Sequence, residues 1–212
     1  MLIIFDCDGV LVDSEILAAE ALANLLRREG FDIHAESLFQ FVGMKQADIL
    51  QGVSELIGAP VPAQVPNGLW AETRAIFAQK LKPLPAVEAF IKQHAPLRCV
   101  ASSSHHERIR FSLEKTGLIE LFGANIYSST EVKHGKPAPD LFLHAAKQMG
   151  ERPDNCLVIE DSPAGVTGAK AAGMRVIGFT GGAHSGPHFA DRLRQAGADE
   201  IAGDYRHIAQ IL

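Results

Sequence analysis

The stretch "MLIIFDCDGVLVDSE", residues 1–15, decides the fold of this chain. An unbroken apolar run, Leu2–Phe5, is followed directly by Asp6 and, two residues later, by Asp8. Apolar runs without alternation are typical of strands that are buried on both faces, as in a parallel sheet covered by helices. The opening residues therefore predict a buried strand that presents two carboxylates at its C-terminal end.

Later segments repeat this pattern. Apolar runs lie at 97–101, 157–159 and 175–179, and 126–128 is a further short candidate strand. Helical patterns at 107–115, 140–149 and 164–172 lie between or beside these runs, and Gly150 and Gly173 stand where C-terminal helix caps are expected. Alternating strands and helices predict right-handed crossovers and a doubly wound, Rossmann-like parallel α/β sheet.

Residues 15–80 carry no strand pattern, and they are predicted to form a helical cap domain inserted into an α/β core of residues 1–14 and 81–212. Ser14 is expected to cap a first helix that ends before Gly30. A second helical pattern covers 35–57, "GAPVPAQVP" at 58–66 breaks it, and a third helix is expected at 68–81. The connections near 12–15 and 80–84 are the expected hinges.

Composition excludes several classes of protein. The chain has 212 residues, of which 47% are hydrophobic and 21% charged, so a packed core is expected and disorder is not. A formal net charge of -5 gives no general attraction to nucleic acid or to an anionic membrane. The apolar runs are too short for a membrane span or a signal peptide. Cys7, Cys99 and Cys156 lack metal-ligand spacing, and buried free thiols in a cytoplasmic protein are expected.

Polar residues follow the predicted strands, where open α/β sheets bind ligands. These residues are the aspartates after the first strand, a run of serines, a lysine before a helix and a final acidic pair: Asp6, Asp8, Ser102, Ser103, Ser104, Lys136, Glu160 and Asp161. Four acids and one base repel one another unless a hard cation lies among them. Oxygen ligands with room for water and phosphate suit Mg²⁺.

These pieces, in this order, resemble the haloacid dehalogenase-like (HAD) superfamily of phosphohydrolases. Within this superfamily, the chain resembles the subfamily of β-phosphoglucomutase and phosphoglycolate phosphatase, whose members carry a helical C1 cap. The matching motifs are D-x-D-G-V from Asp6, the serine that closes "VASS", Lys136 in "GKPAPD", and "EDS" from Glu160. The resemblance spans nearly the whole chain, including the cap.

The resemblance implies a Mg²⁺-dependent phosphatase that works through an aspartyl-phosphate. Asp6 is the implied nucleophile, and Asp8 is the implied general acid and base. The implied metal ligands are Asp6, the backbone carbonyl of Asp8, and Asp161, with Glu160 acting directly or through water. We expect the carboxylates of Asp6 and Asp8 to lie on the same side of the strand end.

The same resemblance implies how the substrate is bound. Ser102, with Ser103 beside it, would hydrogen-bond the phosphate, and Lys136 would neutralise charge on the phosphoryl group. The loop at 43–46, with Lys45 and Gln46, would contact the leaving group. The implied substrate is a small phosphorylated metabolite, such as a sugar phosphate, a sugar-acid phosphate or phosphoglycolate. We expect a monomer or weak homo-oligomer without nucleic-acid or membrane partners.

Two alternatives stay open at this point. A sugar-phosphate mutase of the β-phosphoglucomutase type would share all four motifs. Those enzymes carry a histidine in the first cap helix, where Ala18 stands here, and a cap arginine where this chain offers Lys45 and Gln46. The second alternative is a non-catalytic phospho-switch like a receiver domain, which uses similar residue types. Receivers place the acidic pair early and the phosphorylated aspartate mid-chain, the reverse of the order found here.

Simple structural roles compete with some of these assignments. At least one serine of 102–104 is expected to cap the following helix, and Ser14 and Asp13 to be no more than a capping pair. Ser162 followed by Pro163 is typical of a helix start. The histidines at 105, 106, 134, 184 and 188 leave a histidine metal site open, but surface or rim-lining positions are favoured because no pair has ligand spacing.

Overall fold

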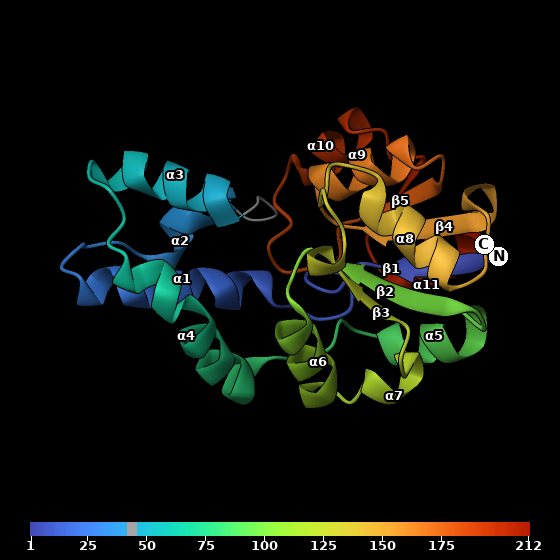
Figure 1. The fold of residues 1–212 in the computed structure, drawn as a ribbon, viewed down its shortest axis with the longest axis horizontal. Helices are drawn as coiled ribbons and strands as arrows, with labels where there is room; N and C mark the ends of the chain where they lie inside the picture. Colours follow the sequence, from blue (N-terminus) through green and yellow to red (C-terminus); the bar gives the residue numbers. More distant parts are fainter. Residues whose placement is uncertain (42–45) are drawn as a thin grey trace.

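A sheet of parallel strands in the order β3-β2-β1-β4-β5-β6 lies at the centre of the computed structural model, which describes residues 1–41 and 46–212 (Figure 1). The strands are β1 (Leu2–Phe5), β2 (Arg98–Ser102), β3 (Ile126–Ser128), β4 (Cys156–Glu160), β5 (Arg175–Phe179) and β6 (Glu200–Ala202). The predicted doubly wound parallel sheet is confirmed. The edge strand β6 was not predicted.

The direction of winding changes at β1. This strand pairs with β2, where Ile4 lies opposite Cys99, and with β4, where Ile4 lies opposite Val158. Because the strand order runs outward from β1 in both directions, a crevice forms beyond its carboxyl end. Residues that follow β1, β2 and β4 therefore meet at one edge of the sheet.

Helices cover both faces of the sheet, which explains the unbroken apolar runs. One face carries α5 (Val87–His94), α6 (His106–Lys115), α7 (Ile119–Phe122) and α11 (Tyr205–Ile211). The other carries α8 (Asp140–Gln148), α9 (Pro163–Ala171) and α10 (Phe189–Gln195). Ile3 and Phe5 belong to the core on the first face, and Leu2 and Ile4 to the core on the second.

A group of helices lies to one side of the sheet: α1 (Glu15–Arg28), α2 (Ala35–Leu38), α3 (Gln46–Ile57) and α4 (Gln64–Lys80) (Figure 1). These cap helices have a hydrophobic core of their own, to which Leu22, Leu26, Val53 and Val65 contribute. The division into a cap of 15–80 and a core of 1–14 and 81–212 stays a prediction.

Two cap helices differ from their predicted bounds. The single helix predicted at 35–57 is two helices, α2 and α3, in the structure. The first has only four residues and leads into a 3-10 turn at Phe39–Phe41. The helix predicted at 68–81 begins at Gln64, inside the segment expected to break it. Pro66 lies in the first turn of α4, where its missing N–H leaves no helical hydrogen bond unmade.

The two chain connections between cap and core run side by side. The N–H of Asp13 donates to the carbonyl of Lys82 over 3.1 Å, and the N–H of Leu84 donates to the carbonyl of Leu11 over 2.9 Å. The two predicted hinge segments are thus hydrogen-bonded to each other. Their role as hinges stays a prediction.

Several local expectations are confirmed. Gly150 and Gly173 both have positive φ, at 70° and 76°, just after α8 and α9. The three cysteines are buried and free. Within the described ranges, none of the helices has the length and apolar character needed to cross a membrane.

Candidate active site

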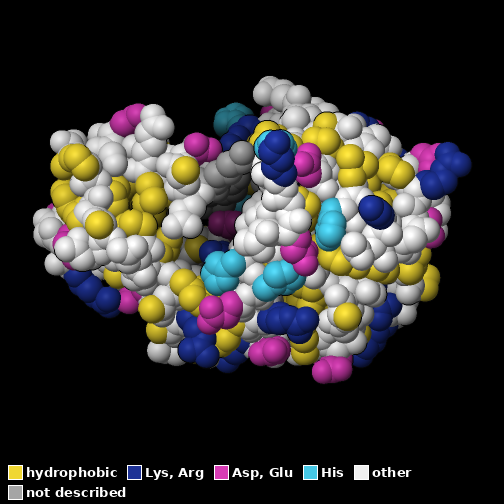
Figure 2. Space-filling view, in the orientation of Figure 1, with side chains coloured by type: hydrophobic (Ala, Val, Ile, Leu, Met, Phe, Trp, Pro, Cys, Tyr) yellow, Lys and Arg dark blue, Asp and Glu magenta, His cyan; other side chains and the backbone are white. Residues whose placement is uncertain are grey.

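A cavity of about 700 Å³ separates the cap helices from the carboxyl edge of the sheet. Figure 2 shows the hollow between the two parts, with acidic surface visible inside it. The cap side is lined by residues that include Ala18, Leu22 and Trp70, and the sheet side by residues that include Asp6 and Lys136. The polar residues predicted to gather beyond the strands therefore face one cavity.

Lys136 joins two of the predicted carboxylates. Its ammonium donates to Oδ1 of Asp6 over 2.7 Å and to Oε1 of Glu160. All three side chains are buried, with Lys136 and Asp6 only 4% and 7% exposed. Burial lowers the pKa of Lys136, but the charges of Asp6 and Glu160 outweigh burial and raise it above its usual value. Lys136 is thus a permanent cation at the end of β1.

Asp6, Glu160 and Asp161 form an acidic cluster, in which one oxygen from each lies within 4.8 Å of the others. Burial, followed by the effect of neighbouring carboxylates that Lys136 only partly offsets, raises the pKa of Asp6 and of Asp161 well above the usual value. One oxygen of Glu160 binds Lys136, and the other accepts the N–H and hydroxyl of Ser162. The cluster offers hard oxygen ligands, and one ammonium does not balance the charge of its three carboxylates. Such a site fits a divalent cation such as Mg²⁺.

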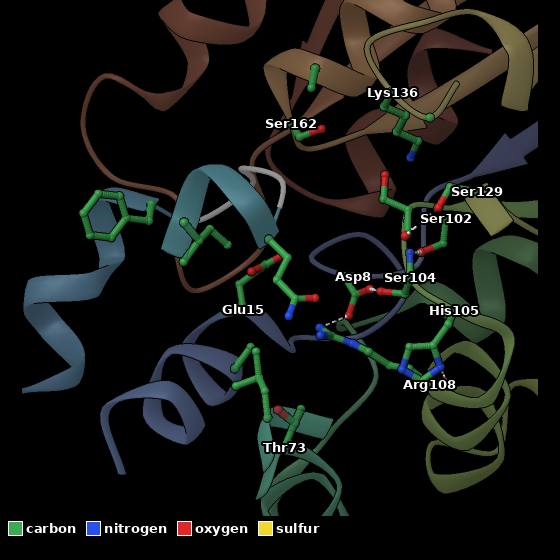
Figure 3. A pocket seen from close by; sticks show the side chains of 18 of the residues that line it. Asp8, Glu15, Thr73, Ser102, Ser104, His105, Arg108, Ser129, Lys136 and Ser162 are labelled. Atoms are coloured by element: carbon green, nitrogen blue, oxygen red, sulfur yellow. Dashed lines mark hydrogen bonds and ion pairs between the residues drawn. The ribbon is translucent and has the colours of Figure 1, made fainter. Parts of the chain in front are cut away.

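Asp8 has different partners from Asp6. Nη2 of Arg108 donates to its Oδ1 and the hydroxyl of Ser104 donates to its Oδ2, each over 2.7 Å (Figure 3). The hydroxyl of Ser14 also donates to Oδ1 over 2.7 Å. Burial raises the pKa of Asp8, but Arg108 and the two hydroxyls outweigh burial and hold this pKa below its usual value. Two carboxylates two residues apart in sequence thus lie in opposite electrostatic environments.

These partners of Asp8 were not predicted. Ser14 stands before α1, but its side chain makes no capping hydrogen bond, so the prediction of a mere capping pair is wrong for Ser14. Its backbone has φ -100° and ψ -22°, in the helical region rather than the extended region that capping needs. Arg108 lies in the first turn of α6, inside a predicted helix, and no local sequence pattern marks its side chain as a partner of Asp8.

The serine run does not cap the helix that follows it. His105 caps α6, since its Nδ1 accepts the N–H of Arg108 over 3.3 Å. Ser102, only 1% exposed, accepts the N–H of Ser104. Ser103 is exposed, and its carbonyl accepts the hydroxyl of Ser129. Ser102 and Ser103 line the same cavity as Asp6 and Lys136. Ser162, by contrast, caps α9 as predicted.

The cap contributes both predicted and unpredicted polar residues to the cavity. Gln46 begins α3 and lines the cavity, whereas Lys45 lies outside the described residues. Glu15, the first residue of α1, also lines the cavity and was not predicted. Burial, then the charges of Asp8 and Asp161, raise the pKa of Glu15 to about 7.

The acidic cluster in the described parts of the chain contains no histidine, but one histidine, His184, contacts its member Asp161. His106 pairs with Glu131 and His134 with Asp140, both away from the cluster. His184 differs from the expected surface or rim position, because its side chain is only 1% exposed. Its Nε2 lies 3.1 Å from Oδ2 of Asp161. A tight loop after β5, rich in glycine, brings this ring inward.

Gly9 allows Asp161 to approach the loop after β1. Its φ is 72°, and a Cβ at this position would lie 1.7 Å from Oδ2 of Asp161. We expect Gly9→Ala to lower the free energy of unfolding by roughly 2–4 kcal/mol, through backbone strain and displacement of Asp161. Urea denaturation measures this loss. Gly150→Ala is the control, since its φ is 70° and nothing lies within 4 Å of its added Cβ. Equal losses in both variants would contradict the role of Asp161.

Comparisons with known proteins identify the family. The family model of haloacid dehalogenase-like hydrolases matches residues 1–173, and the chain belongs to this family. A 6-phosphogluconate phosphatase of Escherichia coli (strain K12) is 29% identical over 187 residues, which cover 87% of this chain and 85% of the relative. A fructose-1-phosphate phosphatase of the same organism is 31% identical over 178 residues, 82% of this chain and 94% of the relative.

A solved structure agrees with this assignment. A conserved haloacid dehalogenase-like protein of unknown function from Agrobacterium tumefaciens str. C58 is 40% identical to this chain. It superposes with a TM-score of 0.88 over 99% of this chain and 96% of its own. The predicted enzyme class, a phosphoric monoester hydrolase of the HAD superfamily, is confirmed by the family model and by relatives named as phosphatases.

Proposed function

We propose that the protein hydrolyses a small phosphorylated metabolite through an aspartyl-phosphate on Asp6, with Mg²⁺ as cofactor. The observation that carries this proposal is the contrast between the two aspartates. Asp6 lies against Lys136 in the acidic cluster, whereas Asp8 is held by separate donors facing the cavity. This contrast supports a role for Asp6 in attack on phosphorus and a role for Asp8 in proton transfer to the leaving group and from water.

In the first step, the carboxylate of Asp6 attacks phosphorus and the ester P–O bond breaks. Asp8 is ionised in the free protein, because Arg108 and two hydroxyls hold its pKa low, so it must first take up the proton that it gives to the departing oxygen. In the second step, Asp8 takes a proton from water as the water oxygen attacks phosphorus. The bond between Asp6 and phosphorus then breaks, and inorganic phosphate leaves.

Other residues bind and neutralise the phosphoryl group. The ammonium of Lys136 offsets its charge, and Ser102 and Ser103 hydrogen-bond its oxygens. Asp6, the backbone carbonyl of Asp8, and Asp161 would hold Mg²⁺, with Glu160 acting directly or through water. When bound, Mg²⁺ supplies the positive charge that keeps these carboxylates ionised and stabilises the phosphoryl oxygens.

The substrate class follows from the cavity and the relatives. A cavity of about 700 Å³ has room for a sugar phosphate, a sugar-acid phosphate or phosphoglycolate. The relatives are named for one substrate that carries a carboxylate and one that does not. Lys45 and Gln46 of the cap are proposed to contact the leaving group. A cytoplasmic location and a monomeric or weakly oligomeric state stay predictions.

Removal of the metal is expected to stop phosphate release. Purified protein would be assayed against a panel of small phosphate esters with Mg²⁺ and with EDTA. We expect EDTA to lower the rate by at least about 100-fold, because three buried carboxylates then face the phosphate with one ammonium. Added Mg²⁺ restores the rate, and circular dichroism shows whether EDTA leaves the fold intact. Equal rates with and without EDTA would exclude the metal-dependent mechanism.

The mutase alternative has its own readout. Ala18 lines the cavity where the similar mutases carry a histidine, and this favours hydrolysis. β-Glucose 1-phosphate would be incubated with the enzyme, and its products followed by phosphorus NMR. Release of inorganic phosphate from the esters supports the phosphatase. Conversion to glucose 6-phosphate without phosphate release would establish the mutase instead.

Asp8→Asn separates the phosphatase from the receiver-like alternative. We expect turnover to fall by about 10²–10⁴-fold, because the variant has neither a general acid nor a base. With p-nitrophenyl phosphate, whose leaving group needs little protonation, a burst of nitrophenol followed by slow turnover is expected. Asp13→Asn is the control, since the side chain of Asp13 accepts only the N–H of Ala183 among the described residues. Unchanged metal-dependent phosphorylation together with unchanged phosphate release would favour a receiver-like switch.

A further inference from the structure

Arg108 lies on the cap side of Asp8. In the proposed mechanism, the organic part of the substrate occupies this side of the cavity. It comes from α6 of the core and crosses toward the cap, with its guanidinium 5.3 Å from the ring centroid of Phe77 in α4. Figure 3 shows it between Asp8 and the cap residues Glu15 and Thr73, with Lys136 beyond Asp8 in the opposite direction.

Most of the hydrogen-bonding capacity of Arg108 is uncommitted. A guanidinium has five N–H donors, and Asp8 is its one hydrogen-bonded side chain among the described residues. Its Nε is buried and has no partner in residues 1–41 and 46–212. The side chain is 21% exposed, and it lines the cavity. A buried donor without a partner, beside a cavity, indicates a ligand that supplies the acceptor.

The proposed mechanism places that ligand. The transferred phosphoryl group lies at Asp6 and Lys136, and the ester oxygen lies at Asp8, which protonates it. The carbon chain attached to that oxygen therefore extends from Asp8 toward the cap, past the guanidinium. A planar fork of donors at this place matches a carboxylate or a phosphate in two-point contact.

We propose that Arg108 is a specificity-determining residue that binds a second anionic group on the organic part of the substrate. The substrate is thus a phosphorylated acid or a bisphosphate rather than a neutral sugar phosphate. This inference rests on the proposed phosphatase function and names the substrate class of the same site. Arg108 exchanges its partner when the substrate binds, from Asp8 to the substrate's anion.

The surroundings of Asp8 allow this exchange. Ser14 and Ser104 continue to donate to Oδ1 and Oδ2 of Asp8 after Arg108 turns to the substrate, so each oxygen of this carboxylate keeps a hydrogen bond. Glu15 is the other acid that faces Arg108 across the cavity. Since the pKa of Glu15 is raised to about 7, its carboxyl is mostly uncharged below that pH and repels a second anion little.

Matched pairs of substrates test the proposal. 6-Phosphogluconate and sorbitol 6-phosphate differ only in a carboxylate against a CH₂OH group. Fructose 1,6-bisphosphate and fructose 1-phosphate differ only in a second phosphate. The purified full chain with Mg²⁺ is assayed on each pair, and kcat/KM of the anionic member is divided by that of the neutral member. We expect a ratio of at least about 10 for one pair in the wild type.

Variants of Arg108 are expected to remove that ratio. Arg108→Gln lowers kcat for all esters because it also touches Asp8, but division within a pair cancels this effect. The ratio should fall toward 1, mainly through KM of the anionic substrate. Arg108→Lys keeps the charge without the planar fork, and we expect an intermediate ratio. Arg110→Gln is the control, because Arg110 lies on the same helix and is exposed.

Each outcome decides one question. The pair that shows the ratio identifies the anion as carboxylate or phosphate. A wild-type ratio near 1 in both pairs, or a ratio that survives in Arg108→Gln, would overturn the inference and leave Arg108 as a positioning residue for Asp8. If the glutamine variant fails to fold by thermal unfolding, the lysine variant decides. No release from any ester, p-nitrophenyl phosphate included, would instead refute the proposed phosphatase.

Discussion

Asp6→Asn is expected to reduce phosphate release from every ester by at least about 1,000-fold, without loss of stability. The amide of the variant is not a nucleophile that can attack phosphorus. Glu160 is the other described carboxylate in contact with Lys136, but its second oxygen is hydrogen-bonded to Ser162. The fold should tolerate the change, because Asp6 is one of three carboxylates crowded into a buried cluster.

The sign of the stability effect follows from the pKa of Asp6. Because burial and neighbouring acids raise this pKa, the folded chain binds the proton more tightly than the unfolded chain. The charged form is therefore costly near neutral pH, in metal-free protein, and stability is lost as pH rises. Removing the charge relieves this cost and offsets the lost pair with Lys136. A melting temperature at or above that of the wild type in EDTA is expected.

An exposed aspartate is the matched control. Asp191→Asn changes the same functional group in α10, where Asp191 only pairs with Arg194 on the surface. This variant should keep both full activity and stability. If Asp6→Asn retained more than about a tenth of the wild-type rate, the nucleophile would have to be another residue.

Lys136→Met is expected to damage both activity and stability. Asp6 and Glu160 lose their shared ammonium, and the side chain of Glu160 is fully buried. Leaving buried carboxylates without their partner costs about 3–5 kcal/mol. Phosphate release should fall by at least about 100-fold, because Lys136 is the cation that contacts Asp6 among the described residues.

The stability loss in Lys136→Met should depend on pH. Asp6 already has a raised pKa with Lys136 present, and its pKa rises further once the ammonium is gone. The deficit in the free energy of unfolding is thus smallest at low pH, where Asp6 is protonated in both folded proteins. It grows as pH rises through the raised pKa of Asp6 in the folded wild type. Urea denaturation in EDTA at about pH 5 and pH 8 measures this difference.

Lys133→Met separates the effect of burial from that of charge. Lys133 lies three residues earlier and is exposed, so the variant should unfold at the same urea concentration as the wild type. If Lys136→Met were equally stable, the buried ion pairs described here would contribute nothing to folding.

The sheet could be predicted from sequence because its signal is local. Strands buried on both faces read as unbroken apolar runs, and β1, β2, β4 and β5 all do so. The three-residue strand β6 was not predicted from the sequence, because Glu200 is exposed and Ile201 is only partly buried. Such a short edge strand depends on its pairing with β5 rather than on its own pattern.

The site residues that could be predicted from sequence are those that lie at or directly after the end of a predicted strand. Asp6, Asp8, Ser102 and Asp161 are placed by that rule alone. Arg108 could not be placed, because the direction of its side chain depends on how α6 packs against the cap. For the same reason, the sequence could not show that the hydroxyl of Ser14 binds Asp8, six residues away, rather than its own helix.

The paired connections between cap and core have a mechanical consequence. Since Leu11 and Asp13 are hydrogen-bonded to Leu84 and Lys82, the two crossings of the chain lie on one line rather than at two separate points. Under the predicted hinge motion, α1–α4 would rotate against the sheet about that line. Ser14 lies on this axis and holds Asp8. We therefore expect opening and closing of the cap to change the orientation of Asp8, the proposed acid.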